Sequence, residues 1–342
     1  MLQILAVTLP FFALVAAGYL AARRRVLPID AIPGLNVFVL FFALPCMLYR
    51  FGARTPIAQL LDGPVALVWG LGALTMVGVT IALTRRGRRN WNDASFGALV
   101  AAFPNTGFMG VPLLAALLGA GMLGPAIIAI TLDMVLTSSL CIALSRLDGV
   151  GRRPVPGTAR AADGDGEGDG RTDVATALRQ VFRGVVVNPL PWSILLGGLA
   201  SATGFALPEP IDRAIAMLAE AASPAALFTI GAVLARPAVL AARQGLAARR
   251  APVGDVLPVV LLKLVAHPLL IWGLARLASA VGLGVSREAL VVMVLVAALP
   301  SASNVSMLAE RFGADNGRIA RIILWTTVGS FVTFALITRW LH

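Results

Sequence analysis

Two interrupted apolar stretches carry the polar residues best suited to holding a small ligand. Each contains a proline followed by small hydroxyl or amide side chains, namely Pro104, Asn105, Pro300, Ser301, Ser303 and Asn304. Proline removes a backbone donor and clashes with the preceding turn, so a helix breaks there and restarts beyond it. The restarting half-helix presents free N–H groups and the positive end of its dipole. Two such ends facing one cavity, with side-chain donors beside them, would bind an anion.

Ionisable side chains inside other apolar runs are candidates for ion coupling. These are Asp133, Glu220 and Lys263. A charge at the centre of a membrane helix costs about 2.5–3.5 kcal/mol on insertion scales, so we expect each to face the interior of a helix bundle. Buried carboxylates can carry protons, and the alternative is a structural charge pair that locks two helices together. His267 follows Lys263 on the same helix face, either as a packed core histidine or as a proton relay.

Motifs for enzymatic chemistry are missing from the sequence. Its two histidines, His267 and His342, cannot build a metal cluster, an HExxH site or a histidine-based triad. The sequence also lacks a Walker loop for nucleotide phosphates. We therefore expect no enzyme, no cofactor, no bound metal and no ATPase activity of its own.

The composition places these residues in a lipid bilayer. Of the 342 residues, 58% are hydrophobic and 13% are charged, and the mean hydropathy is +0.86. Soluble domains carry about 25% charged residues, so soluble enzymes are nearly excluded. The net charge of +11 comes from arginines in short clusters between apolar runs. This distribution is typical of topology signals in membrane proteins and not of a nucleic-acid-binding surface.

Ten apolar segments are long enough to cross about 30 Å of hydrocarbon as helices. They cover residues 2–21, 33–51, 64–84, 94–117, 123–146, 185–203, 211–234, 255–278, 288–310 and 318–340. The connections on one side hold 21 basic residues against 6 on the other, and the arginine-rich side should face the cytoplasm. The first segment lacks a preceding basic region, so a retained span fits better than a cleaved signal peptide. We predict a multi-pass protein of the inner (cytoplasmic) membrane with both termini outside.

The two halves of the chain resemble each other. Motifs recur at a slowly drifting offset, as in Pro45 with Pro224, Gly52 with Gly231, and Ala101–Pro104 with Ala297–Pro300. Five spans in each copy would place the second copy upside down, and such inverted repeats are typical of secondary transporters. The predicted organisation is a first five-helix repeat over 1–146, a cytoplasmic linker over 147–184, and a second, inverted five-helix repeat over 185–342.

Motifs along nearly the whole chain resemble the auxin efflux carrier family, which includes plant auxin exporters and bacterial malate and malonate permeases. The matching stretches are Phe103–Leu113, Val187–Pro189, Pro224–Gly231, Lys263–Pro268, and Ala298–Pro300 followed by Leu308–Gly313. The resemblance implies an all-α integral membrane fold of ten helices in two inverted five-helix repeats, with crossing broken helices 4 and 9. It also implies a scaffold part, a transport part, elevator-type alternating access and, often, a homodimer.

The same resemblance assigns residues of the binding site. Asn105 matches the family asparagine beside the crossover that contacts the substrate carboxylate, and Asn188 matches the asparagine of the sixth helix near the same site. After Pro300 the sequence departs from the plant pattern, because Ser301–Asn304 replaces a Gln-Gly stretch. The central connection is also far shorter than in many plant members. Both departures favour a small bacterial organic anion over auxin.

The expected function is that of a secondary carrier for a small organic anion, such as a mono- or dicarboxylate, working by uniport or with proton coupling. A sodium-coupled organic anion symporter of the bile-acid type is one alternative, although the crossover supplies few acids for a sodium site. The other alternative is a membrane receptor that binds an anion without transporting it. Sodium-dependent uptake would favour the symporter, and saturable binding without counterflow would favour the receptor.

Overall fold

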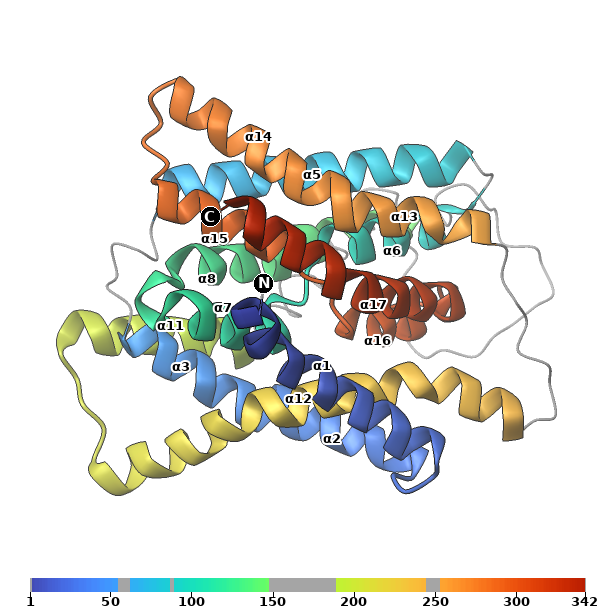
Figure 1. Cartoon of the computed structure of the whole chain (residues 1–342), viewed down its shortest axis with the longest axis horizontal. Coiled ribbons are helices and arrows are strands. Elements are labelled where there is room, and N and C mark those ends of the chain that lie inside the picture. The colour runs from blue at the N-terminus through green and yellow to red at the C-terminus, as the bar shows by residue number, and fades with distance from the viewer. Residues whose placement is uncertain (1, 55–61, 87–88, 148–188, 244–252, 342) are drawn as a thin grey trace, which may run out of the picture.

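The computed structural model describes residues 2–54, 62–86, 89–147, 189–243 and 253–341, and within these ranges the chain folds into helices without a β-strand (Figure 1). Six helical stretches there are long and apolar enough to cross a membrane, namely Ile29–Arg54, Gly63–Arg86, Gly124–Ser145, Glu209–Leu240, Leu257–Ala280 and Asn316–Leu341. Shorter apolar helices cover Phe12–Arg23, Thr106–Leu118 and Trp192–Thr203. The predicted all-α class is confirmed for the described residues, and these apolar helices agree with an integral membrane protein. Asn188 and all but the first residue of the expected linker lie outside the described residues.

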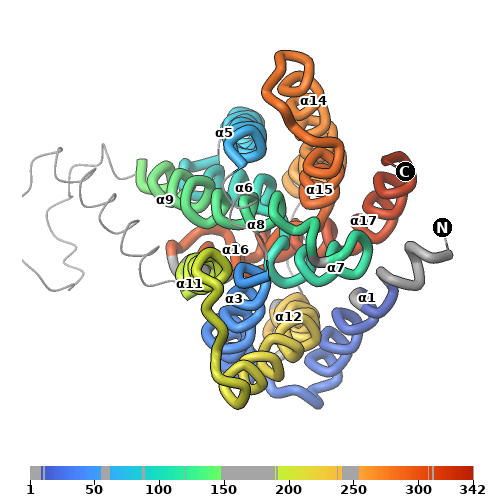
Figure 2. The backbone as a smooth tube through the Cα atoms, turned by 90° about the vertical axis from the view of Figure 1, so that its left-hand side faces the viewer, coloured from blue at the N-terminus to red at the C-terminus, as the bar shows by residue number. Residues whose placement is uncertain are grey.

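The helices form two groups that lie side by side (Figures 1 and 2). The first group, in the lower part of Figure 1, contains α1 (Leu2–Arg23), α2 (Ile32–Phe38), α3 (Leu44–Arg54), α11 (Pro189–Thr203) and α12 (Glu209–Arg243). The second contains α5 (Gly63–Arg86), α6 (Trp91–Ala102), α7 (Val111–Leu118), α8 (Gly124–Leu132), α9 (Ser138–Ser145), α13 (Leu257–Leu261), α14 (His267–Ala280), α15 (Arg287–Ala297), α16 (Asn304–Arg311) and α17 (Asn316–Leu341). Each group therefore draws helices from both halves of the sequence.

Glycines allow two close helix crossings within the first group. Where α1 crosses α12, Gly18 lies against the backbone of Phe228, and Gly231 lies against the backbone of Val15 and Tyr19. Where α3 crosses α11, Gly52 and Gly197 approach each other's backbone in the same way. Small residues let membrane helices pack backbone to backbone, which replaces the hydrophobic driving force that lipid does not supply.

Wide π-helical turns precede prolines at recurring positions. The turns Val39–Ala43 (η2), Thr106–Gly110 (η3) and Leu262–Ala266 (η8) each end two residues before a proline, at Pro45, Pro112 and Pro268. Proline cannot donate to the carbonyl one turn back and its ring clashes there, so the helix widens instead of continuing regularly. A fourth π-helical turn, Asp133–Thr137 (η5), has no such proline, and there the Ser138 hydroxyl donates to the Asp133 carbonyl over 2.9 Å.

Candidate functional site

Two helix breaks lie against each other in the second group. α6 ends at Ala102 and η3 begins at Thr106, while α15 ends at Ala297 and α16 begins at Asn304. The extended residues between them pair as an isolated antiparallel bridge between Pro104 and Ser301. Asn105 N donates to Pro300 O over 2.8 Å, and Ala302 N donates to Phe103 O over 3.0 Å. The breaks that the sequence placed at Pro104 and Pro300 are therefore in direct backbone contact.

The polar side chains of this crossing are largely removed from solvent. Asn105, Ser301 and Ser303 are 3%, 1% and 8% exposed. Among the described residues, Ser301 Oγ and Asn304 Oδ1 are buried without a hydrogen-bond partner. A buried polar atom left unpaired costs about 1–3 kcal/mol, so such atoms usually mark a place that a ligand or water fills. The crossing therefore offers unused hydrogen-bonding capacity where two half-helices begin.

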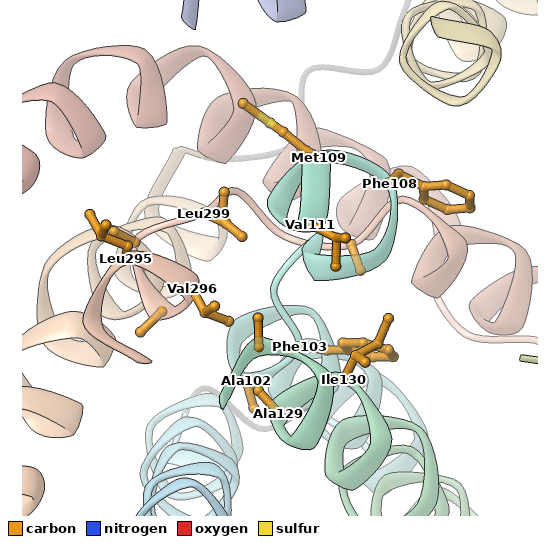
Figure 3. Close-up of a cluster of buried hydrophobic side chains, with 14 of the residues drawn as sticks. Ala102, Phe103, Phe108, Met109, Val111, Ala129, Ile130, Leu295, Val296 and Leu299 are labelled. Atoms are coloured by element: carbon orange, nitrogen blue, oxygen red, sulfur yellow. The ribbon is translucent and has the colours of Figure 1, made fainter. Parts of the chain in front are cut away.

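Apolar side chains enclose the crossing. Figure 3 shows Phe103 beside Ile130, with Phe108, Val111 and Leu299 around the two breaks. All five are buried, and they come from both broken helices and from α8. Exclusion of water strengthens every electrostatic contact made inside such an environment. An anion held here would be bound by backbone and side-chain dipoles, without direct contact to a cationic side chain.

A second buried polar cluster surrounds Asp133, which is fully buried in η5. Its Oδ1 accepts hydrogen bonds from Trp69 Nε1 over 3.2 Å and from Thr137 Oγ1 over 3.0 Å. Its Oδ2 is buried and has no partner among the described residues. One carboxylate oxygen is thus held in place by two donors, and the other forms no hydrogen bond with the described residues.

Lys263 links this cluster to the crossing. It is fully buried in η8, and its Nζ donates to Ala297 O over 2.9 Å and lies 3.0 Å from His267 Nδ1. Ala297 is the last residue of α15, so Lys263 Nζ lies at the negative end of the half-helix that leads into the break. The ring of His267 in turn packs against Trp69, with centroids 5.6 Å apart.

The ionisable residues that the sequence placed inside membrane helices differ in their burial and pairing. Asp133, Lys263 and His267 are buried in one region as expected, but no ion pair joins Asp133 to Lys263 within the described part of the chain. Asp133 is instead linked to Lys263 through Trp69 and His267, and Trp69 was not among the residues predicted from the sequence. The one available signal was its indole N–H, which needs an acceptor when buried.

Glu220 departs from the prediction, because its side chain is exposed on α12 instead of facing the bundle interior. The buried face of α12 runs through Ala222, Ala226 and Ile230, which follow one another at single-turn spacing. Glu220 lies about 200° around the helix from Ala222 at 3.6 residues per turn. The burial argument for a coupling role therefore applies to Asp133 and not to Glu220.

Replacing Asp133 separates its hydrogen-bonding role from its charge. We expect Asp133→Leu to lower the free energy of unfolding by about 1–3 kcal/mol, because the buried donors of Trp69 and Thr137 lose their acceptor. Asp133→Asn keeps an oxygen at the same place and should lose clearly less. Thermal unfolding of both variants in one detergent measures the difference. An equal loss in the two variants would show that the charge, and not the hydrogen bonds, stabilises the cluster.

A charged network joins the ends of α6 and α16 that lie away from the crossing. Arg89 forms ion pairs with Asp255, Asp315 and Asp93, and the buried Arg318 donates to the backbone carbonyls of Asp93 and Asp255. Partial burial lowers the pKa of Arg89, but the Asp255 hydrogen bond and the three carboxylate charges raise it by more, so its pKa lies above the ordinary value. This network fastens the connections before α6, before α13 and before α17 to one another.

The chain is similar to known membrane transport proteins along nearly its whole length. A family model described as "Membrane transport protein" matches residues 4–338. A protein of Rhizobium meliloti (strain 1021) named "Putative malonate transporter" is 30% identical over 337 residues, covering 97% of this chain and 94% of that protein. An "Uncharacterized transporter" of Methanothermobacter thermautotrophicus is 27% identical over 330 residues, covering 96% and 95%.

A plant protein is a more distant relative. "Auxin efflux carrier component 8" of Arabidopsis thaliana is 22% identical over 268 residues, covering 68% of this chain and 72% of that protein. Together with the family match, these similarities identify a multi-pass membrane transport protein and not an enzyme. The chain therefore belongs to the membrane transport protein family, the auxin efflux carrier family that its sequence motifs resemble.

Proposed function

We propose that this protein is a secondary carrier that moves a small organic anion, such as a mono- or dicarboxylate, across the cytoplasmic membrane. The observation that carries the proposal is the paired break, where Ser301 Oγ and Asn304 Oδ1 are buried without partners among the described residues. The malonate named for the Rhizobium meliloti relative fits the proposed class, because a small dicarboxylate offers several oxygens to donors such as the Ser301 hydroxyl.

The substrate carboxylate would lie at the crossing. Asn105, Ser303 and the amide nitrogen of Asn304 would donate to it, and the Ser301 hydroxyl would turn towards it. The first turns of η3 and α16 would add backbone N–H groups and the positive ends of two helix dipoles. Asn188, assigned to the site by the family resemblance, would contribute from the sixth helix.

We propose ten membrane helices arranged as two inverted repeats, 1–146 and 185–342, joined by the cytoplasmic linker 147–184. Support comes from the glycine crossings: Gly18 and Gly197 are 179 positions apart, as are Gly52 and Gly231. With this offset α1 corresponds to α11 and α3 corresponds to α12. The α1–α12 contact therefore corresponds to the α11–α3 contact, as a pseudo-twofold axis requires. Inverted repeats of this kind place a substrate site near the membrane midplane.

The two helix groups suit an elevator-type alternating-access cycle. The crossing, the Asp133 cluster and the Arg89 network all lie in the second group, which would move against the first. Uniport is one energetic basis, because an inside-negative potential favours anion exit by about 2.3 kcal/mol per charge per 100 mV. Proton coupling through Asp133 is the other. We further propose a homodimer with both termini outside.

Uptake into proteoliposomes tests the function directly. A labelled panel of malonate, malate, succinate and an indole carboxylate would be offered while membrane potential and pH gradient are set independently. Saturable flux of a small carboxylate supports the carrier, and its response to potential or to the pH gradient separates uniport from proton coupling. Flux that requires sodium would indicate a symporter. Saturable binding without any flux would overturn the carrier in favour of a receptor.

A further inference from the structure

Two adjoining cavities lie away from the crossing, between α14, α15 and α17. The larger holds about 250 Å³ and is lined almost wholly by apolar side chains. Its lining includes Leu264, Pro268, Leu269, Val294, Leu336 and Trp340. Figure 2 shows these three helices together at the edge of the second group. An apolar cavity of this kind has no means of holding a small carboxylate, so it does not belong to the proposed substrate site.

The smaller cavity holds about 200 Å³ and has a different chemistry. Arg276 and Arg287 both line it, together with Trp272 and Trp340, whose ring centroids are 5.3 Å apart. Neither arginine takes part in an ion pair within the described ranges of the chain. Glu288, the nearest acidic residue in the sequence, is not part of the lining. Two guanidinium groups without an ion-pair partner among the described residues therefore line one pocket.

Trp340 belongs to the lining of both cavities, so the apolar and the cationic cavity adjoin. The cationic cavity lies where α14 nears its end at Ala280, α15 begins at Arg287 and α17 ends at Leu341. Leu269 and Trp340 are each 53% exposed on the outer side of these helices. Tryptophans and arginines near the ends of membrane helices are typical of the boundary between hydrocarbon and headgroups.

We propose that these cavities form one binding site for an anionic phospholipid. The phosphate would be bound by Arg276 and Arg287 between the two tryptophans, and one acyl chain would lie in the apolar cavity beside Leu269 and Leu336. A free anion gains nothing from the apolar cavity, and an uncharged lipid gains nothing from the arginines. Only a molecule with both an anionic group and an apolar chain matches the combined lining of the two cavities. Basic pockets between membrane helices bind anionic headgroups in this way.

Lipid titration of the purified, delipidated full-length protein tests the site without using transport. Binding of phosphatidylglycerol would be measured by native mass spectrometry and by the rise in thermal unfolding temperature, beside phosphatidylcholine and glycerol phosphate. We expect saturable binding of phosphatidylglycerol, with weaker binding of phosphatidylcholine and none of glycerol phosphate. The double variant Arg276→Gln/Arg287→Gln should weaken phosphatidylglycerol binding roughly 30-fold, because each basic residue near a membrane surface contributes about one kcal/mol to the attraction of an anionic lipid.

Two further variants separate the parts of the site. Arg339→Gln removes an exposed arginine of α17 that lines neither cavity and should leave binding unchanged. Leu336→Trp fills the apolar cavity and should weaken binding while both arginines remain. The proposal fails if phosphatidylcholine binds as tightly as phosphatidylglycerol, if glycerol phosphate competes as well as the intact lipid, or if the double arginine variant binds like the Arg339→Gln control.

Discussion

Gly231→Ala is expected to lower the free energy of unfolding by about 1–3 kcal/mol, the range found when extra atoms are forced into a packed site. A Cβ atom there would overlap the Val15 carbonyl oxygen and come within 2.7 Å of Tyr19 N. Both neighbours are backbone atoms of α1, so no side-chain rotation relieves the overlap, and the two helices must separate. Thermal unfolding in detergent, followed by size-exclusion retention after heating, measures the loss. Gly18→Ala on the facing helix should have a similar effect.

Gly78→Ala is the matched control for this experiment. Gly78 lies in α5, and a Cβ atom added there meets nothing within 4 Å. Alanine is a better helix former than glycine by about 1 kcal/mol, so this variant should be as stable as the parent or more so. The same substitution is thus expected to act in opposite directions at two positions. If Gly231→Ala were as stable as Gly78→Ala, the close crossing of α1 and α12 would be wrong.

The double variant Asn105→Ala/Asn304→Ala is expected to reduce carboxylate uptake at least about 100-fold. Both asparagines flank the paired break, and hydrogen bonds to a charged group are worth about 1.5–3 kcal/mol each. The loss should appear as a higher half-saturation concentration and a lower rate, while the unfolding temperature changes little. Initial rates over a range of substrate concentrations in proteoliposomes separate these effects. Asn36→Ala, in α2 of the first group, serves as the control.

Unchanged uptake by a folded Asn105→Ala/Asn304→Ala protein would remove the crossing from the proposed function. Ser301→Ala offers an independent check, because it deletes one of the two unpaired buried atoms without disturbing the backbone bridge. A loss of transport in the asparagine variant together with full activity in Ser301→Ala would restrict the site to the amides. These outcomes are independent of lipid binding at Arg276 and Arg287.

Much of the candidate site could be predicted because its causes are local. Proline weakens a helix in mid-span, and the small polar residues after Pro104 and Pro300 weaken it further, so breaks at these two places could be predicted from the sequence. Proline alone does not suffice, because Pro224 lies inside the continuous helix α12. Hydropathy likewise predicts helices over the apolar segments, because lipid requires every backbone group to be bonded within its own segment. The burial of Asp133 and Lys263 follows from the cost of a charge in hydrocarbon.

What the sequence alone determined about this protein is therefore its helical class, its membrane setting, the positions of its helix breaks and, through the motifs, its family. Only the tertiary structure decided which groups meet, as the Lys263 ammonium nitrogen does with the Ala297 carbonyl and Trp69 with Asp133, and it places the side chain of Glu220 on the exposed side of α12. The physical reason is that the rotation of each helix about its axis depends on packing against helices distant in sequence. The hydropathy pattern of a membrane helix says little about this rotation, because its lipid-facing and protein-facing sides are both apolar.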